Sequence, residues 1–568
     1  MITRFAKKSL TLSPPQLLFA SIKSSARVRK VGLRPEEVMK IVNAAVCRSD
    51  PEEWVANCLY NCRKTDVPLD TSHMTLLSDA LRKNSHPFSN PQMGKIFYGL
   101  RRRRSTDPAV CSILDTASRR MPDKMTSHTY ASVLFSMANM SSNSLEVRKL
   151  LSALRLKILS SDDELSGQAI GNILYGMQCM TCESQEVLDM VGCVYPLVAL
   201  STCELSGQEI GNALYGLQRM NSEYEEVRQL VFVLAAKISA STRSFNSQSL
   251  GNALYGLQSL SSHHAEVRAL VAALTDKIRA SECELDHQSV GNALYGLQGL
   301  SAARVEVRAL LLALRDKIAE SKCQLNGQEI GNALYGLRCM SSEWPEVRSL
   351  LRVLRMKVDS SSSDLSAQAV GSAVYGLQCM SSEWPEVRET ISALGDKLRH
   401  SRCELDHQAI GNILYGLKGM TSGSKEVCGL LEILSIRIAK SRSELSDQEL
   451  GNALYGLQGM SSDSREVRDL LVTLRDKIAG SGCMMSGQAV GMALYGLQRM
   501  NSKWSEVRDV LTVLHEKIAA STCELSGLAL GNALYGLQCM SADCEEVDKL
   551  VSALCGKVVA DNINDDKV

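Results

Sequence analysis

The stretch LSGQEIGNALYGLQRM at residues 205–220 returns along the chain every 40 residues. Its central string GNALYGL, or a close variant of it, begins at ten glycines with this spacing, from Gly171 to Gly531. Two looser copies precede them and begin at Gly94 and Ala131. A fixed period of this length is typical of solenoid and propeller proteins.

Each repeat unit contains two amphipathic helical patterns and no strand pattern. Ser206 is a helix N-cap candidate, and Glu209 stands where it closes a capping box. Apolar residues then recur with a 3.6-residue period over 210–220, and again over 227–238 after a short polar turn. One such hairpin cannot bury its apolar face alone, so neighbouring hairpins must stack. We therefore expect an all-α protein, an α-solenoid of about twelve two-helix repeats with a 40-residue period.

The chain is divided by composition into four parts. Residues 1–34 hold eight Lys/Arg and no acidic residue, which favours an organelle transit peptide over a disordered basic arm. Residues 35–130 are expected to form degenerate N-terminal helical repeats that cap the array, and residues 131–560 the regular array. Residues 561–568 are expected to form an acidic disordered tail. The leader predicts a mitochondrial location, with plastid or cytoplasm as alternatives.

Several function classes are excluded by composition. No apolar run approaches the roughly 20 residues of a membrane-spanning helix, so no membrane insertion is expected. No phosphate loop, paired-histidine metal site or nucleophile–base arrangement is present, and a repeated residue is a poor catalyst because an active site needs several different residues to converge. We therefore expect a non-enzymatic protein with no cofactor, no metal and no small-molecule substrate. Nineteen cysteines, an odd number, without an apolar leader indicate a reducing compartment.

The first helix of each repeat is expected to carry a polar stripe opposite its apolar face. Wound at about 100° per residue, Gln208, Asn212, Tyr215 and Arg219 cluster on that side. The first three types recur with few exceptions, whereas the Arg219 position and the turn before the second helix vary. Fixed polar groups beside variable ones are what a modular reader of single-stranded RNA needs, since the fixed groups can hold the backbone or stack on bases while the others discriminate. The candidate RNA- or partner-binding residues are Gln208, Asn212, Tyr215, Arg219, Gln248, Asn252, Tyr255, Gln288, Asn292, Tyr295, Gln328, Asn332, Tyr335, Tyr375, Gln408, Asn412, Tyr415, Gln448, Asn452, Tyr455, Tyr495 and Arg499.

A structural role for the same stripe is the alternative. The Gln, Asn and Tyr side chains could form hydrogen bonds between neighbouring repeats, with the tyrosine packed as a spacer. Two glycines, Gly211 and Gly216, flank the stripe although each costs a helix about 1 kcal/mol relative to alanine. We expect them to permit a close approach between the first helices of adjacent repeats.

Charge is distributed unevenly along the chain. The formal net charge is +1, made up of +11 over residues 1–130 and −10 over the remainder. The most concentrated positive run is Arg101, Arg102, Arg103 and Arg104, which is either a solvated helix end or a phosphate contact. In the second helix of each repeat a fixed Glu is followed two residues later by Arg in most copies, which predicts a Glu–Arg ladder between repeats.

The repeat resembles the octotricopeptide family of organellar RNA-binding proteins, and it is similar to the helical arrays that precede RAP domains. That family's helix reads roughly Ser-x-Gln-(Glu/Asp)-Leu-Ala-Asn-x-Leu-Trp-Ala-Leu, and residues 205–217 read LSGQEIGNALYGL, with Tyr215 in place of Trp. SSEWPEV at 341–347 and 381–387 is similar to the family's Pro-Glu-Trp segment. The resemblance covers about residues 88–560, although glycine replaces alanine and no RAP domain follows. It implies sequence-selective binding of single-stranded RNA in a mitochondrion or plastid, supporting RNA processing, stability or translation.

Two functional hypotheses follow. The first is a non-enzymatic helical-repeat RNA-binding protein. The second is a protein–protein interaction scaffold of the HEAT/armadillo type that binds an extended peptide or a partner surface. The acidic array argues against the first, because attraction to phosphates usually supplies much of the affinity for nucleic acid.

Overall fold

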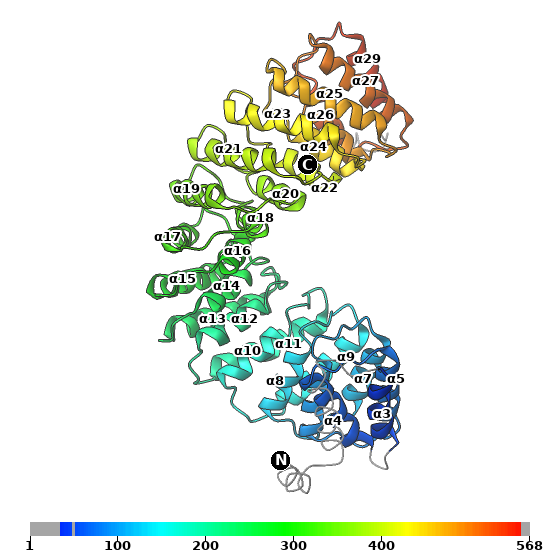
Figure 1. Ribbon diagram of the computed structural model, residues 1–568, viewed down its shortest axis with the longest axis vertical. Helices are drawn as coiled ribbons and strands as arrows, with labels where there is room; N and C mark the ends of the chain where they lie inside the picture. Colours follow the sequence, from blue (N-terminus) through cyan, green and yellow to red (C-terminus); the bar gives the residue numbers. More distant parts are fainter. Residues whose placement is uncertain (1–34, 48–50, 558–568) are drawn as a thin grey trace, which may run out of the picture. The chain divides into compact units, whose positions relative to one another are not determined.

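The fold is an α-solenoid built from tandem helical hairpins. The computed structural model describes residues 35–47 and 51–557, so the expected leader (1–34) and tail (561–568) lie outside the described residues. This part of the chain contains 27 α-helices, one 3-10 helix and no β-strand (Figure 1). The predicted fold class is confirmed. The chain divides into two compact units, residues 1–277 and 278–568.

The helices alternate between two kinds. The A helices, which come first in each repeat, are α4 (Pro51–Lys64), α6 (Asn90–Leu100), α8 (Ser127–Ser136), α10 (Gly167–Tyr175), α12 (Gly207–Tyr215), α14 (Ser247–Tyr255), α16 (His287–Tyr295), α18 (Gly327–Tyr335), α20 (Ala367–Tyr375), α22 (His407–Gly416), α24 (Asp447–Tyr455), α26 (Gly487–Tyr495) and α28 (Gly527–Gly536). The B helices are α3 (Pro35–Val46), α5 (Thr71–Arg82), α7 (Pro108–Arg119), α9 (Leu145–Leu159), α11 (Gln185–Leu200), α13 (Glu225–Ala240), α15 (Ala265–Ala280), α17 (Val305–Glu320), α19 (Pro345–Ser360), α21 (Pro385–His400), α23 (Lys425–Lys440), α25 (Arg465–Gly480), α27 (Ser505–Ala520) and α29 (Glu545–Cys555). Gly296–Gly299 forms the 3-10 helix η1.

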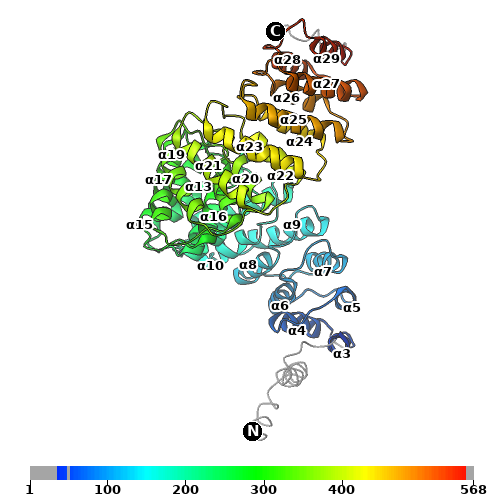
Figure 2. The ribbon, with the colours of Figure 1, turned by 45° about the horizontal axis from the view of Figure 1, so that its top comes forward.

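Helices of one kind pack on one another within each unit. In unit 1 the A helices from α4 to α14 pack on one another in order, and so do the B helices from α3 to α13; in unit 2 the same holds for α16 to α28 and for α17 to α29. The helices of each unit therefore form two layers. Figure 2 shows α4, α6 and α8 in one row and α5, α7 and α9 in another. A side chain at one position of the repeat therefore lies beside the same position of the next repeat.

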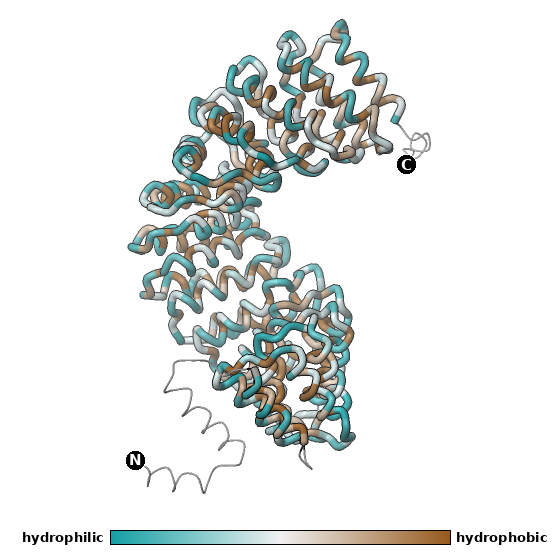
Figure 3. The backbone as a smooth tube through the Cα atoms, turned by 45° about the vertical axis from the view of Figure 1, so that its right-hand side comes forward, coloured by the Kyte–Doolittle hydropathy of each residue, from teal (hydrophilic) through white to brown (hydrophobic). Residues whose placement is uncertain are grey.

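The helix cap and the buried helix face predicted for residues 205–238 are both confirmed. Ser206 caps α12: its hydroxyl accepts the backbone N–H of Glu209, whose carboxylate accepts the backbone N–H of Ser206 at 2.8 Å. The apolar residues of α13 that face the first layer, from Val227 to Ile238, are fully buried. In Figure 3 hydrophobic stretches lie along the helices and hydrophilic ones in the turns that join them.

The A helix is shorter than the sequence suggested. The apolar period runs to Met220, but α12 ends at Tyr215, and the next backbone hydrogen bonds span three residues, as in Leu217 N–H to Leu214 O at 2.8 Å. A three-residue spacing still keeps Leu217 and Met220 buried while the chain turns toward the B helix. Arg219 therefore lies exposed in a turn after the helix, and Arg499 occupies the same place in its repeat.

The expected close approach of A helices is confirmed. A β-carbon added at Gly216 would overlap the backbone carbonyl of Leu174 on the preceding A helix. One added at Gly211 would come within 2.8 Å of the Ser249 carbonyl oxygen on the following one. Glycine is used at these two positions because the neighbouring backbones leave no room for a side chain.

Candidate functional site

The tyrosines of the stripe form stacked columns. In unit 1, Phe135, Tyr175, Tyr215 and Tyr255 follow one another with ring centroids 5.0, 5.8 and 5.3 Å apart. In unit 2 the column runs from Tyr295 to Tyr535, with centroids 5.4–5.7 Å apart and planes inclined by 17–24°. These are offset stacks of the kind that aromatic pairs prefer.

The columns correct one expectation about the tyrosines. Neighbouring rings cover each other's faces, so inside a column no ring face is left on which an RNA base could stack. The close approach of the A helices is the physical reason, since it brings equivalent rings within stacking distance. The tyrosine rings therefore act as spacers between repeats, as the structural alternative proposed. Only the ring edges and the hydroxyls face outward.

The hydroxyl of Tyr335 shows how such a group is held. Burial raises the pKa of Tyr335, and neighbouring tyrosines raise it further although Arg338 opposes the rise. The Tyr335 hydroxyl accepts a hydrogen bond from Arg338, and Lys418 Nζ donates to the Tyr415 hydroxyl at 3.3 Å. These hydroxyls can donate a hydrogen bond to a ligand.

The amides of the stripe behave differently from the tyrosines. The Gln208 side chain is exposed and that of Asn212 is half-buried, and the same holds along the array. Across the described part of the chain, no side chain of the following set has a hydrogen-bond partner: Gln208, Gln248, Gln288, Gln328, Gln408, Gln448, Asn212, Asn252, Asn292, Asn332, Asn412 and Asn452. The amides therefore do not make the inter-repeat hydrogen bonds that the structural alternative requires of them.

Other recurring polar residues do join the repeats. The Ser222 hydroxyl accepts the backbone N–H of Ser261 at 2.9 Å, and the Ser241 hydroxyl donates to the Leu205 carbonyl at 2.8 Å. A lysine near the end of most B helices donates to a serine carbonyl of the preceding repeat. These lysines are Lys237, Lys277, Lys317, Lys357, Lys397, Lys477, Lys517 and Lys557. Each of these part-buried ammonium groups is engaged in a contact between repeats.

A second polar row lies beside the stripe and was missed by the sequence reading. It sits three residues after each tyrosine: Gln258 Nε2 donates to Gln218 Oε1 at 3.4 Å, and Gln218 Nε2 donates to Gln178 Oε1 at 3.5 Å. Arg338 and Lys418 occupy this position in two repeats. The signal was available, because the glutamine recurs with the same period as the tyrosine.

The A face is more positive than the array as a whole. In the ten regular copies, the positions equivalent to 208, 212, 215, 218 and 219 hold four basic residues and no acidic one. The basic residues are Arg219, Arg338, Lys418 and Arg499. On the B helices the predicted Glu–Arg ladder is present, for example between Arg148 and Glu186 at 3.6 Å and between Arg468 and Glu506 at 3.4 Å. These four cations can attract a polyanion although the array as a whole is acidic and Asp447 lies on the same face.

In unit 2 the stripe lines a groove. A cavity of about 710 Å³ opens among α20, α22, α24, α26 and α28, with Gln448, Asn452 and Tyr455 on its wall. Met492 lines it where other repeats carry Asn, and Asn532 lines it from the last A helix. The unpaired amides are therefore accessible to a ligand in a concave surface.

The arginine run after α6 does not form a single positive patch. The Arg101 guanidinium lies over the rings of Tyr98 and Phe135, at 5.0 and 4.2 Å from their centroids. Arg103 donates to the Leu69 carbonyl at 2.5 Å. Arg102 and Arg104 are exposed. Two of the four side chains are thus directed inward and two outward.

In three repeats the variable turn before the B helix contains a tryptophan that packs against the preceding repeat. Trp344, Trp384 and Trp504 each lie against an arginine of the preceding repeat, with ring centroids 3.7–4.1 Å from the guanidinium carbon. This is a cation–π arrangement. These tryptophans contribute to repeat packing.

Neither a metal cluster nor a membrane span is found in the described residues. No group of three or more His, Cys, Asp or Glu side chains is placed to hold a metal ion between residues 35 and 557, the gap at 48–50 apart. None of the described helices is long and apolar enough to cross a bilayer.

Comparisons with known proteins find similarity of fold only. No family model and no curated protein matches the sequence. Similar structures include a chain of a homology model of the full-length AP-3 complex (TM-score 0.38, 11% identity, 98% of this chain and 99% of that one). Yeast Rmd9p in complex with a 16-nt target RNA has a TM-score of 0.29 at 11% identity, covering 89% of this chain and 94% of its own. The pentatricopeptide repeat protein PPR10 in complex with an 18-nt psaJ RNA element has a TM-score of 0.20 at 13% identity, covering 96% and 92%.

Proposed function

We propose that this protein is a non-enzymatic helical-repeat protein that binds single-stranded RNA along its A face. The observation that carries the proposal is the row of Gln and Asn side chains without hydrogen-bond partners in the described residues, beside recurring serines, lysines and Gln218-type glutamines that join the repeats. A row of free amides at a 40-residue period suits a ligand that is itself a linear polymer of similar units. The octotricopeptide-like repeat motif agrees with this ligand class.

The chemistry of binding follows from the groups that the A face presents. Amides donate to and accept from base edges and the ribose, while the four basic residues of the row contact phosphates. Base stacking contributes nothing inside the tyrosine columns, because the ring faces are covered. Affinity would therefore rest on hydrogen bonds and on phosphate attraction.

A salt series tests this function. Filter binding of homopolymeric RNAs should give an affinity that falls as salt rises, because each neutralised phosphate releases counterions. With four basic residues engaged, the slope of log K against log salt is about −3, and the affinity falls by roughly 50-fold from 50 to 200 mM salt. Absence of binding at 50 mM salt contradicts the proposal and favours the extended-peptide scaffold.

The same proposal places the protein in the mitochondrion, where it supports RNA processing, stability or translation. Its support is the basic, acid-free composition of residues 1–34. A fluorescent reporter that carries residues 1–34 should be imported into mitochondria. A diffuse cytosolic signal would contradict the location and leave the binding proposal to its own test.

A further inference from the structure

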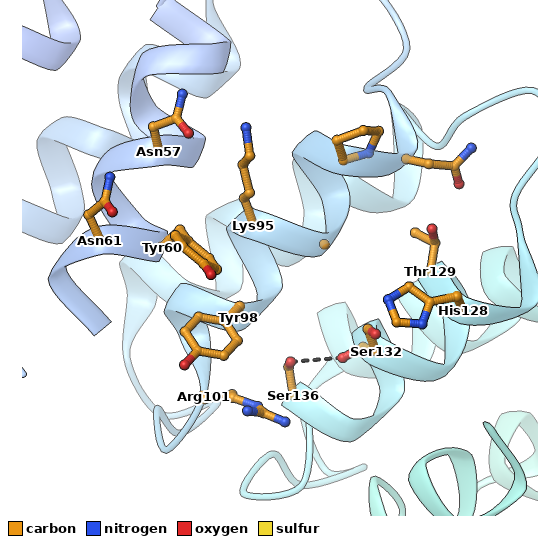
Figure 4. A pocket seen from close by; sticks show the side chains of 13 residues that line it. Asn57, Tyr60, Asn61, Lys95, Tyr98, Arg101, His128, Thr129, Ser132 and Ser136 are labelled. Atoms are coloured by element: carbon orange, nitrogen blue, oxygen red, sulfur yellow. Dashed lines mark hydrogen bonds between the residues drawn. The ribbon is translucent and has the colours of Figure 1, made fainter. Parts of the chain in front are cut away.

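A second cavity lies on the A face of the first three A helices, outside the regular copies. It has a volume of about 630 Å³ and is lined from α4, α6 and α8. Figure 4 shows Asn57 and Tyr60, Lys95 and Tyr98, and the hydroxyls of α8 arranged around it. Its volume falls within the roughly 300–1,000 Å³ of small-molecule sites.

The aromatic column is interrupted at this cavity. Tyr60 and Tyr98 are 4.9 Å apart but tilted by 40°, and the next ring, Phe135, is separated from Tyr98 by the Arg101 guanidinium. Arg101 stands three residues after Tyr98, where Gln218 stands after Tyr215. Part of the ring surface of Tyr60 and Tyr98 therefore borders a cavity, whereas the equivalent rings of the regular copies cover one another.

The charge of Arg101 is not matched by any carboxylate among the described residues. Its Nε is buried without a hydrogen-bond partner. Arg63 nearby is paired with Asp66 at 2.9 Å. Burial lowers the pKa of Arg101, and the positive charge of Arg63 also lowers it, although the neighbouring Tyr98 hydroxyl opposes the change. The other cation of the cavity, Lys95, is paired with Glu53 at 2.5 Å. An anion bound beside Arg101 would supply the missing partner.

Neutral polar groups complete the wall. The side chain of Asn61 and the ring of His128 have no hydrogen-bond partner in the part of the chain that the structure describes, and both line the cavity. Asn57 donates to Glu53 at 2.9 Å and keeps its carbonyl oxygen free. Amide and imidazole edges beside a tyrosine ring can read a planar heterocycle with donors and acceptors.

We infer that this cavity binds one nucleoside monophosphate, with its phosphate against Arg101 and its base against the Tyr60 ring. The monophosphate can come from two sources. One is the terminal nucleotide of a bound RNA strand, and for this source the inference rests on the proposed function. In unit 1 the A helices α10, α12 and α14 carry the amide row, and α8 holds His128 and Ser132 at the equivalent positions. Because α4 is the first described A helix, a strand that follows these A helices reaches the cavity with its end. The other source is a free nucleotide.

Gly94 provides a way to block the cavity without disturbing the fold. It lines the cavity, and a β-carbon added there meets nothing within 4 Å. A leucine in its place would project into the cavity and would also raise helix propensity. Gly429→Leu is the matched control, since that glycine is also helical with nothing within 4 Å of an added β-carbon and lies in the other unit.

The experiment titrates the full-length protein calorimetrically with UMP, AMP, uridine, adenosine and inorganic phosphate. We expect a monophosphate to bind at least tenfold tighter than its nucleoside and than inorganic phosphate. Gly94→Leu should abolish this binding and Arg101→Gln should remove the preference for the monophosphate, whereas Gly429→Leu and Arg104→Gln leave both unchanged. Thermal melting of each variant shows whether it is folded, and Gly94→Leu decides the test if Arg101→Gln does not fold.

Oligonucleotides distinguish the two sources. Ten-residue oligouridylates with a 5′-phosphate, a 3′-phosphate or neither are titrated in parallel. A tenfold preference for one phosphorylated end that Gly94→Leu removes identifies the strand terminus as the ligand, even if free nucleotides fail to bind. If neither free monophosphates nor phosphorylated ends show a preference sensitive to Gly94→Leu, the inference is wrong. Salt-dependent RNA binding in that case leaves the proposed function standing.

Discussion

Replacing Gly336 with alanine should lower the free energy of unfolding by about 3 kcal/mol, at the upper end of the usual cost of overpacking. An added β-carbon would overlap the carbonyl group of Leu294 on the preceding A helix and lie 3.0 Å from the Tyr295 α-carbon. Backbone atoms cannot move aside as the end of a flexible side chain can. The two A helices must therefore separate, and the tyrosine stack between Tyr295 and Tyr335 separates with them.

Gly429→Ala is the matched control in the same unit. It is the same substitution in a helix, but nothing lies within 4 Å of the added β-carbon. The control should therefore raise stability by about 0.5–1 kcal/mol, through helix propensity alone.

Urea denaturation followed by circular dichroism measures both variants, and hydrogen exchange of α16 to α20 reports whether the loss is local, as nearest-neighbour stacking predicts. Equal midpoints for the two variants would contradict the close approach of the A helices.

Replacing Asn332, Asn412 and Asn452 together with alanine should weaken RNA binding about 100-fold. Each unpaired amide is expected to contribute about 1 kcal/mol through a hydrogen bond to the ligand, and 1.4 kcal/mol corresponds to a tenfold change in Kd. Because none of the three has a hydrogen-bond partner in the described residues, their loss should not destabilise the fold. Alanine is the better helix former, so the melting temperature should stay the same or rise.

The control removes three hydroxyls from the B layer of the same unit. Ser349 and Thr512 donate only to carbonyls of their own helices, and Ser392 lies on α21. The triple variant Ser349→Ala, Ser392→Ala, Thr512→Ala should bind RNA as the wild type does. Equal affinities for the wild type and the asparagine variant would show that the amide row does not contact the ligand. A drop in melting temperature of the asparagine variant would instead assign the amides to the fold.

The sequence was a reliable guide to features that repeat locally. The capping box at Ser206 and the buried face of α13 depend on residues a few positions apart, and both are as predicted. The end of the A helix was misplaced because the apolar period continues to Met220 through a three-residue turn. Periodicity alone does not separate a helix from a turn that keeps the same residues buried.

The sequence predicted the positions of the candidate site residues but not which of them pack between repeats and which stay unpaired. Gln208, Asn212 and Tyr215 share one face in the sequence and in the structure. Only the structure separates them, since the tyrosine rings stack on one another while the amides stay unpaired. The row at Gln218 and the cavity beside Arg101 depend on contacts between positions about 40 residues apart, which helical periodicity does not report.

The amino-acid sequence by itself determined the helical hairpin and its period, because capping, helix propensity and apolar spacing act within a few residues of one another. The tertiary structure decided which polar groups form contacts between repeats and which remain available to a ligand. That outcome depends on how closely adjacent A helices approach. At the distance that Gly216 and its equivalents permit, the tyrosine rings of successive repeats stack on one another, whereas the amides beside them have no hydrogen-bond partner within reach in the described residues.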